Sequence, residues 1–186
     1  MDEVKYYFPF LGALLGAIFT LYLGALLKTR SEKRRYCLNA IAILSIYLEE
    51  LETGLNILQD DLKNLKNDVA LVPSALPKAS WENYQLSEDS LNQLWMLKDK
   101  GEPTITSLPS HLKNCFEHIT KNVVDAKTPK RVAGNIGAVW TTNPGSLVAA
   151  FTMYRDGYEM TINLVKRTIN LLDKRKDEFW VKISEP

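Results

Sequence analysis

Cysteine is scarce in this chain of 186 residues, and the two cysteines that occur are far apart. Cys37 and Cys115 both fall in segments with a helical pattern, and no CxxC motif is present. A disulfide framework needs several cysteines at regular spacings, so a fold stabilised by disulfides is excluded. We expect both thiols to be free.

The chain also lacks the motifs of the common enzyme classes. It contains no GxSxG nucleophile elbow, no Walker phosphate loop, no GxGxxG dinucleotide motif, no HExxH zinc motif and no kinase motifs. These absences favour a protein that is not an enzyme, and we expect no cofactor.

One segment with a helical pattern does bring three zinc-type ligands together. His111, Cys115 and His118 are spaced i, i+4 and i+7, on one side of a helix. However, a zinc site needs a fourth ligand or a water, and a single helix rarely directs three ligands well. The apolar face of the same helix consists of Leu108, Leu112, Phe116, Ile119 and Val123. A cysteine at the edge of that face, flanked by two half-exposed histidines, is the simpler explanation, so we expect no metal.

Charge of one sign is concentrated in a single short stretch. The formal net charge of the chain is +1, but residues 28–35 alone carry +4. The cations of this basic collar are Lys28, Arg30, Lys33, Arg34 and Arg35. Nucleic-acid binding would require a basic face on the folded domain as well, so no nucleic-acid partner is expected. A basic cluster beside an apolar segment indicates anionic lipid headgroups instead, although a solvated stretch of helix is the simpler alternative.

Residues 6–27 contain no charged side chain. A helix of that length covers about 33 Å, which matches the hydrocarbon core of a bilayer. A cleaved signal peptide is the main alternative, but it carries its positive charges before the apolar core, whereas here they follow it. We therefore predict one transmembrane helix in the plasma membrane, a bacterial inner membrane, with the N-terminus outside and the C-terminal domain in the cytoplasm.

Small residues recur every fourth position along this predicted span. They are Gly12, Gly16, Thr20 and Gly24. A ridge of small side chains allows the close backbone approach that holds helices together in lipid. The pattern predicts a homo-oligomer, or contact with a helix of a partner membrane protein.

The remainder of the chain predicts an all-α domain. Residues 36–48 are apolar but too few to cross a bilayer, which favours a core helix over an interfacial or re-entrant segment. Leucines and one valine then form a stripe at positions 48, 51, 55, 58, 62, 65 and 69, a spacing that suits a bundle or a coiled coil. Because no proline or glycine interrupts residues 25–53, the span and this stripe are expected to form one helical rod.

Three further helices are predicted downstream, at residues 88–98, at residues 109–125 and from Pro144 onward. The last carries an apolar stripe at positions 147, 151, 154, 158, 162, 165, 169 and 172. Two long and two short helices suggest a bundle similar to a four-helix bundle. The domain division is therefore residues 1–27 for the tail and span, 28–35 for the collar and 36–186 for the helical domain.

The segment between the third and fourth helices, residues 127–142, is predicted to be a loop with a short extended stretch. Lys127, Lys130, Arg131 and Trp140 lie in it beside two glycines, which allow backbone amides to approach a ligand. We interpret these four residues as a candidate site for an anion or for the acidic segment of a partner. A plain connection with a buried tryptophan is the alternative.

Together these patterns predict a membrane-anchored interaction or scaffold subunit whose partners are the bilayer and other proteins. The alternative is a small membrane effector of the defence or exclusion type, which acts by oligomerisation of its transmembrane helix. An enzyme that uses the region of His111 and Cys115 is the third reading.

Overall fold

The computed structural model describes the backbone of residues 4–67, 71, 75–97, 103–127, 130–131, 138–139 and 144–178. Side chains are described for residues 15–67, 71, 75–92, 94–95, 105–127 and 145–176. The described chain is helical apart from connecting segments and one small β-ladder, so the predicted all-α class is confirmed.

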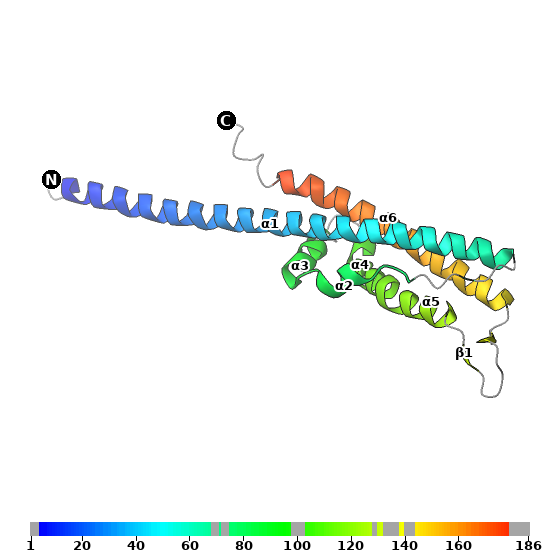
Figure 1. Cartoon of the computed structure of the whole chain (residues 1–186). Coiled ribbons are helices and arrows are strands. Elements are labelled where there is room, and N and C mark those ends of the chain that lie inside the picture. Colours follow the sequence, from blue (N-terminus) through cyan, green and yellow to red (C-terminus); the bar gives the residue numbers. More distant parts are fainter. Residues whose placement is uncertain are drawn as a thin grey trace.

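A single helix, α1, dominates the molecule (Figure 1). It spans Val4–Lys66, 63 residues, and so measures about 95 Å along its axis. The prediction of one uninterrupted rod is confirmed. Its N-terminal part projects beyond the rest of the chain, and its C-terminal part packs in the bundle (Figure 1).

The predicted transmembrane segment occupies the projecting part of α1. Among the residues that the structure describes, no helix has a stretch long and apolar enough to cross a membrane. The side chains of residues 6–14, the first part of the predicted span, lie outside the described residues.

The second long helix, α6, spans Pro144–Glu178 and runs antiparallel to α1 (Figure 1). Pro144 opens it, as predicted, because the first turn of a helix does not need the amide hydrogen that proline lacks. An ion pair between Lys166 Nζ and Glu52 Oε1, 2.8 Å apart, joins the outer surfaces of the two helices. Most of the predicted stripe is buried, namely Leu147, Phe151, Tyr158, Ile162, Val165 and Leu172.

Short elements cover the remaining side of the long pair (Figure 1). They are α2 (Ala79–Asn83), α3 (Glu88–Leu97), the 3₁₀ helix η2 (Pro103–Ser107), α4 (Leu108–Lys113), the π-helix η3 (Asn114–Ile119) and α5 (Thr120–Lys127). The predicted helices at 88–98 and 109–125 match α3 and the continuous run from α4 to α5. The extended stretch predicted in the loop is present as β1 (Lys130–Arg131) paired antiparallel with β2 (Ala138–Val139).

The core begins at Cys37. Cys37, Ala40, Leu44 and Tyr47 are fully buried, so the apolar segment 36–48 is a core helix, as the sequence predicts. Further along the stripe Leu51, Leu58 and Leu62 are buried and Leu48, Leu55 and Leu65 are partly buried, while Val69 lies outside the described residues. The stripe is therefore occupied within the bundle and is not free to form a coiled coil with another chain.

Three aromatic rings at the centre of the core tie α1, α2 and η3 together. Tyr47 lies 5.6 Å from Trp81 and 5.4 Å from Phe116, measured between ring centroids, and Trp81 stacks on Phe116 at 5.9 Å. The indole Nε1 of Trp81 donates a hydrogen bond to Glu117 Oε1 at 2.9 Å. Such rings supply large buried areas in specific geometries, which fixes the short helices against α1.

Candidate functional site

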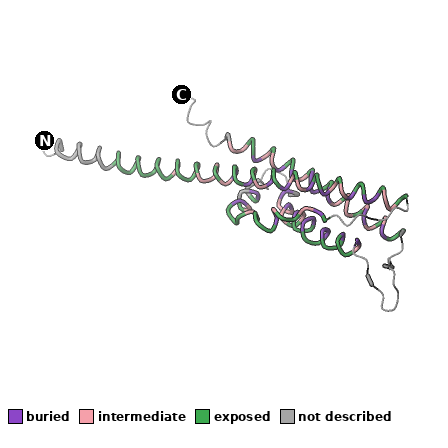
Figure 2. Tube along the Cα trace, viewed as in Figure 1, coloured by how far each residue is buried: buried purple, intermediate pink, exposed green. Residues whose placement is uncertain are grey.

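The projecting part of α1 is largely exposed where its side chains are described (Figure 2). Its large apolar side chains are between 40% and 74% exposed: Leu15, Ile18, Phe19, Leu21, Tyr22, Leu23 and Leu27. At about 100° per residue these positions surround the helix rather than forming one stripe. Among the described residues, no other element covers these side chains.

The predicted small-residue ridge also faces open space. A Cβ atom added to Gly16 or Gly24 would meet no atom of the described chain within 4 Å. Thr20 Oγ1 donates a hydrogen bond to the carbonyl oxygen of Gly16 at 2.7 Å, so its hydroxyl is satisfied within the helix. Gly12 lies among the residues whose side-chain surroundings are not described. The ridge is thus available to another chain from Gly16 to Gly24.

The basic collar occupies the turns between this apolar surface and the first core residue, Cys37. Lys28 and Arg35 are exposed, and Arg30, Lys33 and Arg34 are half-buried. The guanidinium carbon of Arg35 lies 5.5 Å from the centroid of the Tyr36 ring, within the range of a cation–π contact. The collar thus presents its cations beside the end of the apolar rod.

The three candidate zinc ligands have different surroundings in the structure. Cys115 is fully buried against α6, where its thiol donates a hydrogen bond to Thr161 Oγ1 at 3.3 Å. His111 is half-buried and His118 is exposed. Within the described residues, no group of three histidine, cysteine or carboxylate side chains is placed to hold a metal ion.

The π-helix η3 gives the Cys115 carbonyl group several donors. The backbone N–H and the hydroxyl of Thr120 both donate to that oxygen, the hydroxyl at 3.0 Å, and Tyr158 Oη donates at 3.3 Å. Tyr158 belongs to α6, so the widened turn is bonded across the bundle. No spacing in the sequence signalled this contact, because it depends on a tertiary approach between residues 43 positions apart.

Both cysteines lie where their thiols stay protonated near neutral pH. Burial, opposed in part by the hydrogen bond to Thr161, raises the pKa of Cys115 to about 11. Burial also raises the pKa of Cys37, against the opposing charge of Arg175. Both are free cysteines, as predicted. Because the thiolate is the nucleophile, neither residue is placed for thiol chemistry.

Of the predicted anion loop, only Lys127 has a described side chain. It is the last residue of α5, is 3% exposed, and its Nζ lies 2.5 Å from Asp61 Oδ2 of α1. This lysine is therefore engaged inside the bundle. Lys130 and Arg131 are described only as backbone in β1, and Trp140 lies outside the described residues. The loop as an anion site remains a prediction.

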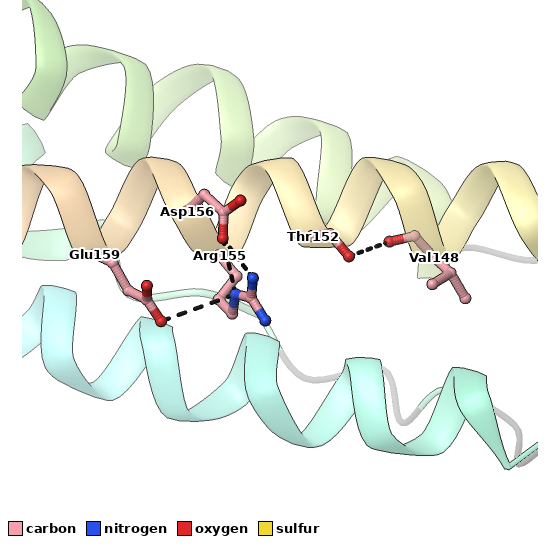
Figure 3. A network of polar contacts seen from close by, with 5 residues as sticks. All are labelled: Val148, Thr152, Arg155, Asp156 and Glu159. Atoms are coloured by element: carbon pink, nitrogen blue, oxygen red, sulfur yellow. Dashed lines mark hydrogen bonds and ion pairs between the residues drawn. The ribbon is translucent and has the colours of Figure 1, made fainter.

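A pocket of about 300 Å³ opens at the end of the bundle farthest from the rod. Its lining combines the last turns of α1 with one residue of α6: Gln59, Leu62, Lys63, Lys66, Asn67 and Arg155. Arg155 donates from Nε and Nη2 to Asp156 Oδ1, at 2.9 and 2.6 Å, and its Nε lies 3.8 Å from Glu159 Oε1 (Figure 3). Thr152, one turn earlier, bonds back to the Val148 carbonyl at 2.7 Å (Figure 3).

This distal pocket was not predicted, because its two sides lie about ninety residues apart in the sequence. Two lysines and an arginine line it, and Arg155 is the cation already neutralised by Asp156 and Glu159. The geometry suits an acidic group better than a basic one.

Comparisons with protein-family models, with curated proteins and with solved structures find no match. The function of the chain therefore has to be inferred from its own residues.

Proposed function

We propose that this chain is a single-pass membrane protein that tethers a helical interaction domain to the cytoplasmic face of the membrane and performs no covalent chemistry. The observation that carries the proposal is the apolar surface around α1 from Leu15 to Leu27, which the bundle leaves uncovered. In water, a contiguous apolar patch of this kind marks an interaction or membrane site. In a bilayer the same side chains are in a favourable solvent.

Membrane extraction tests the anchor. The full chain should remain in the membrane pellet after an alkaline carbonate wash, because an inserted helix is not released by loss of electrostatic contacts. Leu21→Arg combined with Ile18→Arg should release it, since each arginine at mid-span costs about 2.5–3.5 kcal/mol of insertion free energy. Leu38→Arg with Ile46→Arg, on the exposed surface of the bundle part of α1, is the matched control and should stay in the pellet. Release of the wild-type chain would refute the anchor.

Orientation follows from the collar. A reporter that is active only outside the cytoplasm, fused after Pro186, should be silent, because positive charges flanking a span are retained on the cytoplasmic side. Replacing the five collar cations by glutamate should activate it in part of the population. Strong reporter activity in the wild type would invert the proposed topology.

The distal pocket supports a protein partner with an acidic segment. Lys63 and Lys66 are exposed beside Arg155 at the end of the bundle that lies farthest from the anchor, where another chain has access. Lys63→Glu with Lys66→Glu should abolish co-purification of partners from native membranes in mild detergent. Lys113→Glu with Lys121→Glu, exposed on α4 and α5, changes the net charge equally and should not. Loss in both variants would point to net charge rather than to this pocket.

A membrane effector that acts by helix oligomerisation is the second candidate, favoured by the open ridge at Gly16 and Gly24. Gly16→Ile with Gly24→Ile should reduce cross-linked oligomers in membranes while insertion is kept. Ala17→Ile with Ala25→Ile adds similar bulk about 100° around the helix and should leave them intact. An effector should also depolarise cells on overexpression, and a tether should not.

A further inference from the structure

A small β-ladder projects from the end of the bundle that lies farthest from the rod (Figure 1). Its strands β1 and β2 are antiparallel, with Lys130 opposite Val139 and Arg131 opposite Ala138. The sheet has these two strands and no third within the described part of the chain. Each strand therefore has an outer edge without a neighbouring strand among the described residues.

The outer edge of β1 presents unpaired backbone groups. Successive residues of an antiparallel strand alternate, so one of Lys130 and Arg131 exchanges its hydrogen bonds with β2 and the other directs its N–H and C=O groups outward. Such an edge is a template for a further strand. An isolated two-stranded ladder is only marginally stable in water, and a third strand or a packed helix stabilises it. Figure 1 shows the ladder away from the helices, so a third strand is the addition that remains open.

The two strands of the ladder differ in charge. Both residues of β1, Lys130 and Arg131, are cations, whereas both residues of β2 are uncharged. Residues 126–155 contain no aspartate or glutamate, so no carboxylate of this part of the chain offsets the two cations. Lys127, which lies near them in the sequence, is engaged elsewhere, because its ammonium group pairs with Asp61 inside the bundle. The positive edge of the ladder is therefore β1 alone.

We propose that β1 binds an extended acidic segment of a partner protein, which adds to the ladder as a third strand. This inference rests on the proposed function, because it names the kind of segment that the tethered domain holds. Adjacent strands lie about 4.8 Å apart, so carboxylates of the third strand take register positions opposite Lys130 and Arg131. Opposite charges paired across strands stabilise a sheet. The backbone hydrogen bonds then supply affinity, and the charged pairs supply specificity.

Other occupants fit this edge less well. Like charges opposite one another destabilise a sheet, so a second copy of β1 is disfavoured, which is the usual effect of cations on an edge strand. Lipid headgroups lie at the opposite end of the molecule when the rod is the anchor (Figure 1). Nucleic acid requires a broad basic face rather than two cations. An acidic strand is the occupant that satisfies both the backbone groups and the charge of β1.

Peptide binding by the full chain in mild detergent tests the third strand. The probe is a fluorescent hexapeptide that alternates glutamate with threonine, and fluorescence anisotropy should show saturable binding. Lys130→Glu with Arg131→Glu should weaken binding at least about tenfold, because two attractive cross-strand pairs become repulsive. Lys113→Glu with Lys121→Glu makes the same change of charge at exposed positions of α4 and α5, and it should bind the peptide like the wild type.

Two altered peptides separate strand addition from simple attraction between charges. Methylation of the backbone nitrogens keeps every carboxylate but removes the N–H donors, so it should abolish binding. Glutamine in place of glutamate keeps the donors and should weaken binding at least about tenfold. If the methylated peptide binds as well as the parent peptide, no strand is added and the inference is wrong. It is also wrong if the parent peptide does not bind, or if the β1 variant binds it unchanged.

Failure of the third strand differs from failure of the tether. Release of the wild type by an alkaline carbonate wash refutes the tether, whereas peptide binding is measured in detergent and does not depend on insertion. With a tether and no third strand, the chain stays in the membrane pellet and binds the glutamate and glutamine peptides equally. If Lys63→Glu with Lys66→Glu abolishes peptide binding and the β1 variant keeps it, the acidic segment belongs to the distal pocket and the inference is wrong.

Discussion

At the scale of single residues, Gly54 is the position whose structural role differs most from what its residue type suggests. A glycine within a helix is normally a weakness, since it costs about 0.8–1 kcal/mol relative to alanine. Here a Cβ atom would lie 2.5 Å from Cε1 of Tyr158, a fully buried ring. The missing side chain is what lets α6 approach α1 at this level and lets Tyr158 reach the Cys115 carbonyl.

Gly54→Ala should therefore destabilise the bundle by about 1–3 kcal/mol, the usual cost of overpacking a core, despite the better helix propensity of alanine. Gly157→Ala is the matched control. Its Cβ would meet only the terminal Cδ1 of Ile119, at 3.4 Å. That variant should be neutral, or more stable by up to about 1 kcal/mol. Chemical unfolding followed by circular dichroism measures both, and equal effects of the two variants would contradict the packing argument.

The buried thiol of Cys115 predicts a loss of stability at alkaline pH. Burial raises its pKa from 9.0 to about 11, so between these values the folded state keeps a proton that the unfolded state releases. Stability then falls as pH rises through this window, by roughly 2–3 kcal/mol when complete. Cys115→Ser cannot titrate there and should show a smaller decline between pH 9 and 11. Identical pH profiles for the two proteins would assign the decline to other groups, such as Tyr47, whose pKa is about 12.

The ion pair between Lys127 and Asp61 is deeply buried at both ends. Removing one partner leaves the other charge in the core, so Lys127→Ala should cost about 3–5 kcal/mol. Asp61→Leu combined with Lys127→Met removes both charges and should recover most of that loss. Urea unfolding measures the stability of both variants. If the double variant is no more stable than Lys127→Ala, the loss of stability comes from altered packing rather than from the unpaired charge.

At the scale of elements, the long helices follow from spacing alone. Steps of three and four residues place apolar side chains on one face of a helix, and this placement depends only on the local sequence, not on how the helices pack. The stripes of α1 and α6 and the apolar face around Phe116 were all predictable for this reason.

What escaped prediction depends on contacts between distant segments. The short helix α2 has no periodicity to reveal it, and the π-turn η3 gains its donor from α6. Trp81 is buried, whereas Tyr84 and Trp95 are each 55% exposed, and no spacing in the sequence distinguishes the three. An aromatic residue has a general tendency to be buried, but its presence in the sequence does not show which part of the fold it packs against.

The α1 stripe itself can be tested by charge. Leu58 is fully buried, so Leu58→Asp should place an unpaired carboxylate in the core and cost several kcal/mol, with poor expression. Gln59→Asp, one position further on and exposed, introduces the same charge and should change stability by less than about 0.5 kcal/mol. Thermal melts of the full chain in detergent compare them. If Leu58→Asp melted like the parent, this part of α1 would have to be solvated.

At the scale of the whole molecule, the candidate site was only partly predictable. The collar and the small-residue ridge are contiguous or periodic in sequence, and the structure leaves the ridge open from Gly16 to Gly24. The distal pocket, and the approach of the end of α6 to the collar, exist only because α6 runs back along α1. The sequence shows which charged residues these regions contain, but it does not show which residues of the other helix lie next to them.

Because α1 continues without a break from the rod into the bundle, the direction in which the ridge faces is fixed relative to the direction of the core. At about 100° per residue, the ridge around Thr20 points roughly opposite to the core-facing row that contains Ala40, Leu44 and Leu51. Two chains joined along their ridges would then hold their bundles back to back, with α6 and the distal pocket facing outward on both. Two alanines inserted after Thr29 would turn each bundle by about 200°, toward the other copy. Seven would restore the azimuth within about 20° and lift the bundle by about 10 Å. The yield of cross-linked dimers should therefore be kept when seven residues are inserted and should fall when two are inserted. If the joint between rod and bundle were flexible, neither insertion would change the yield.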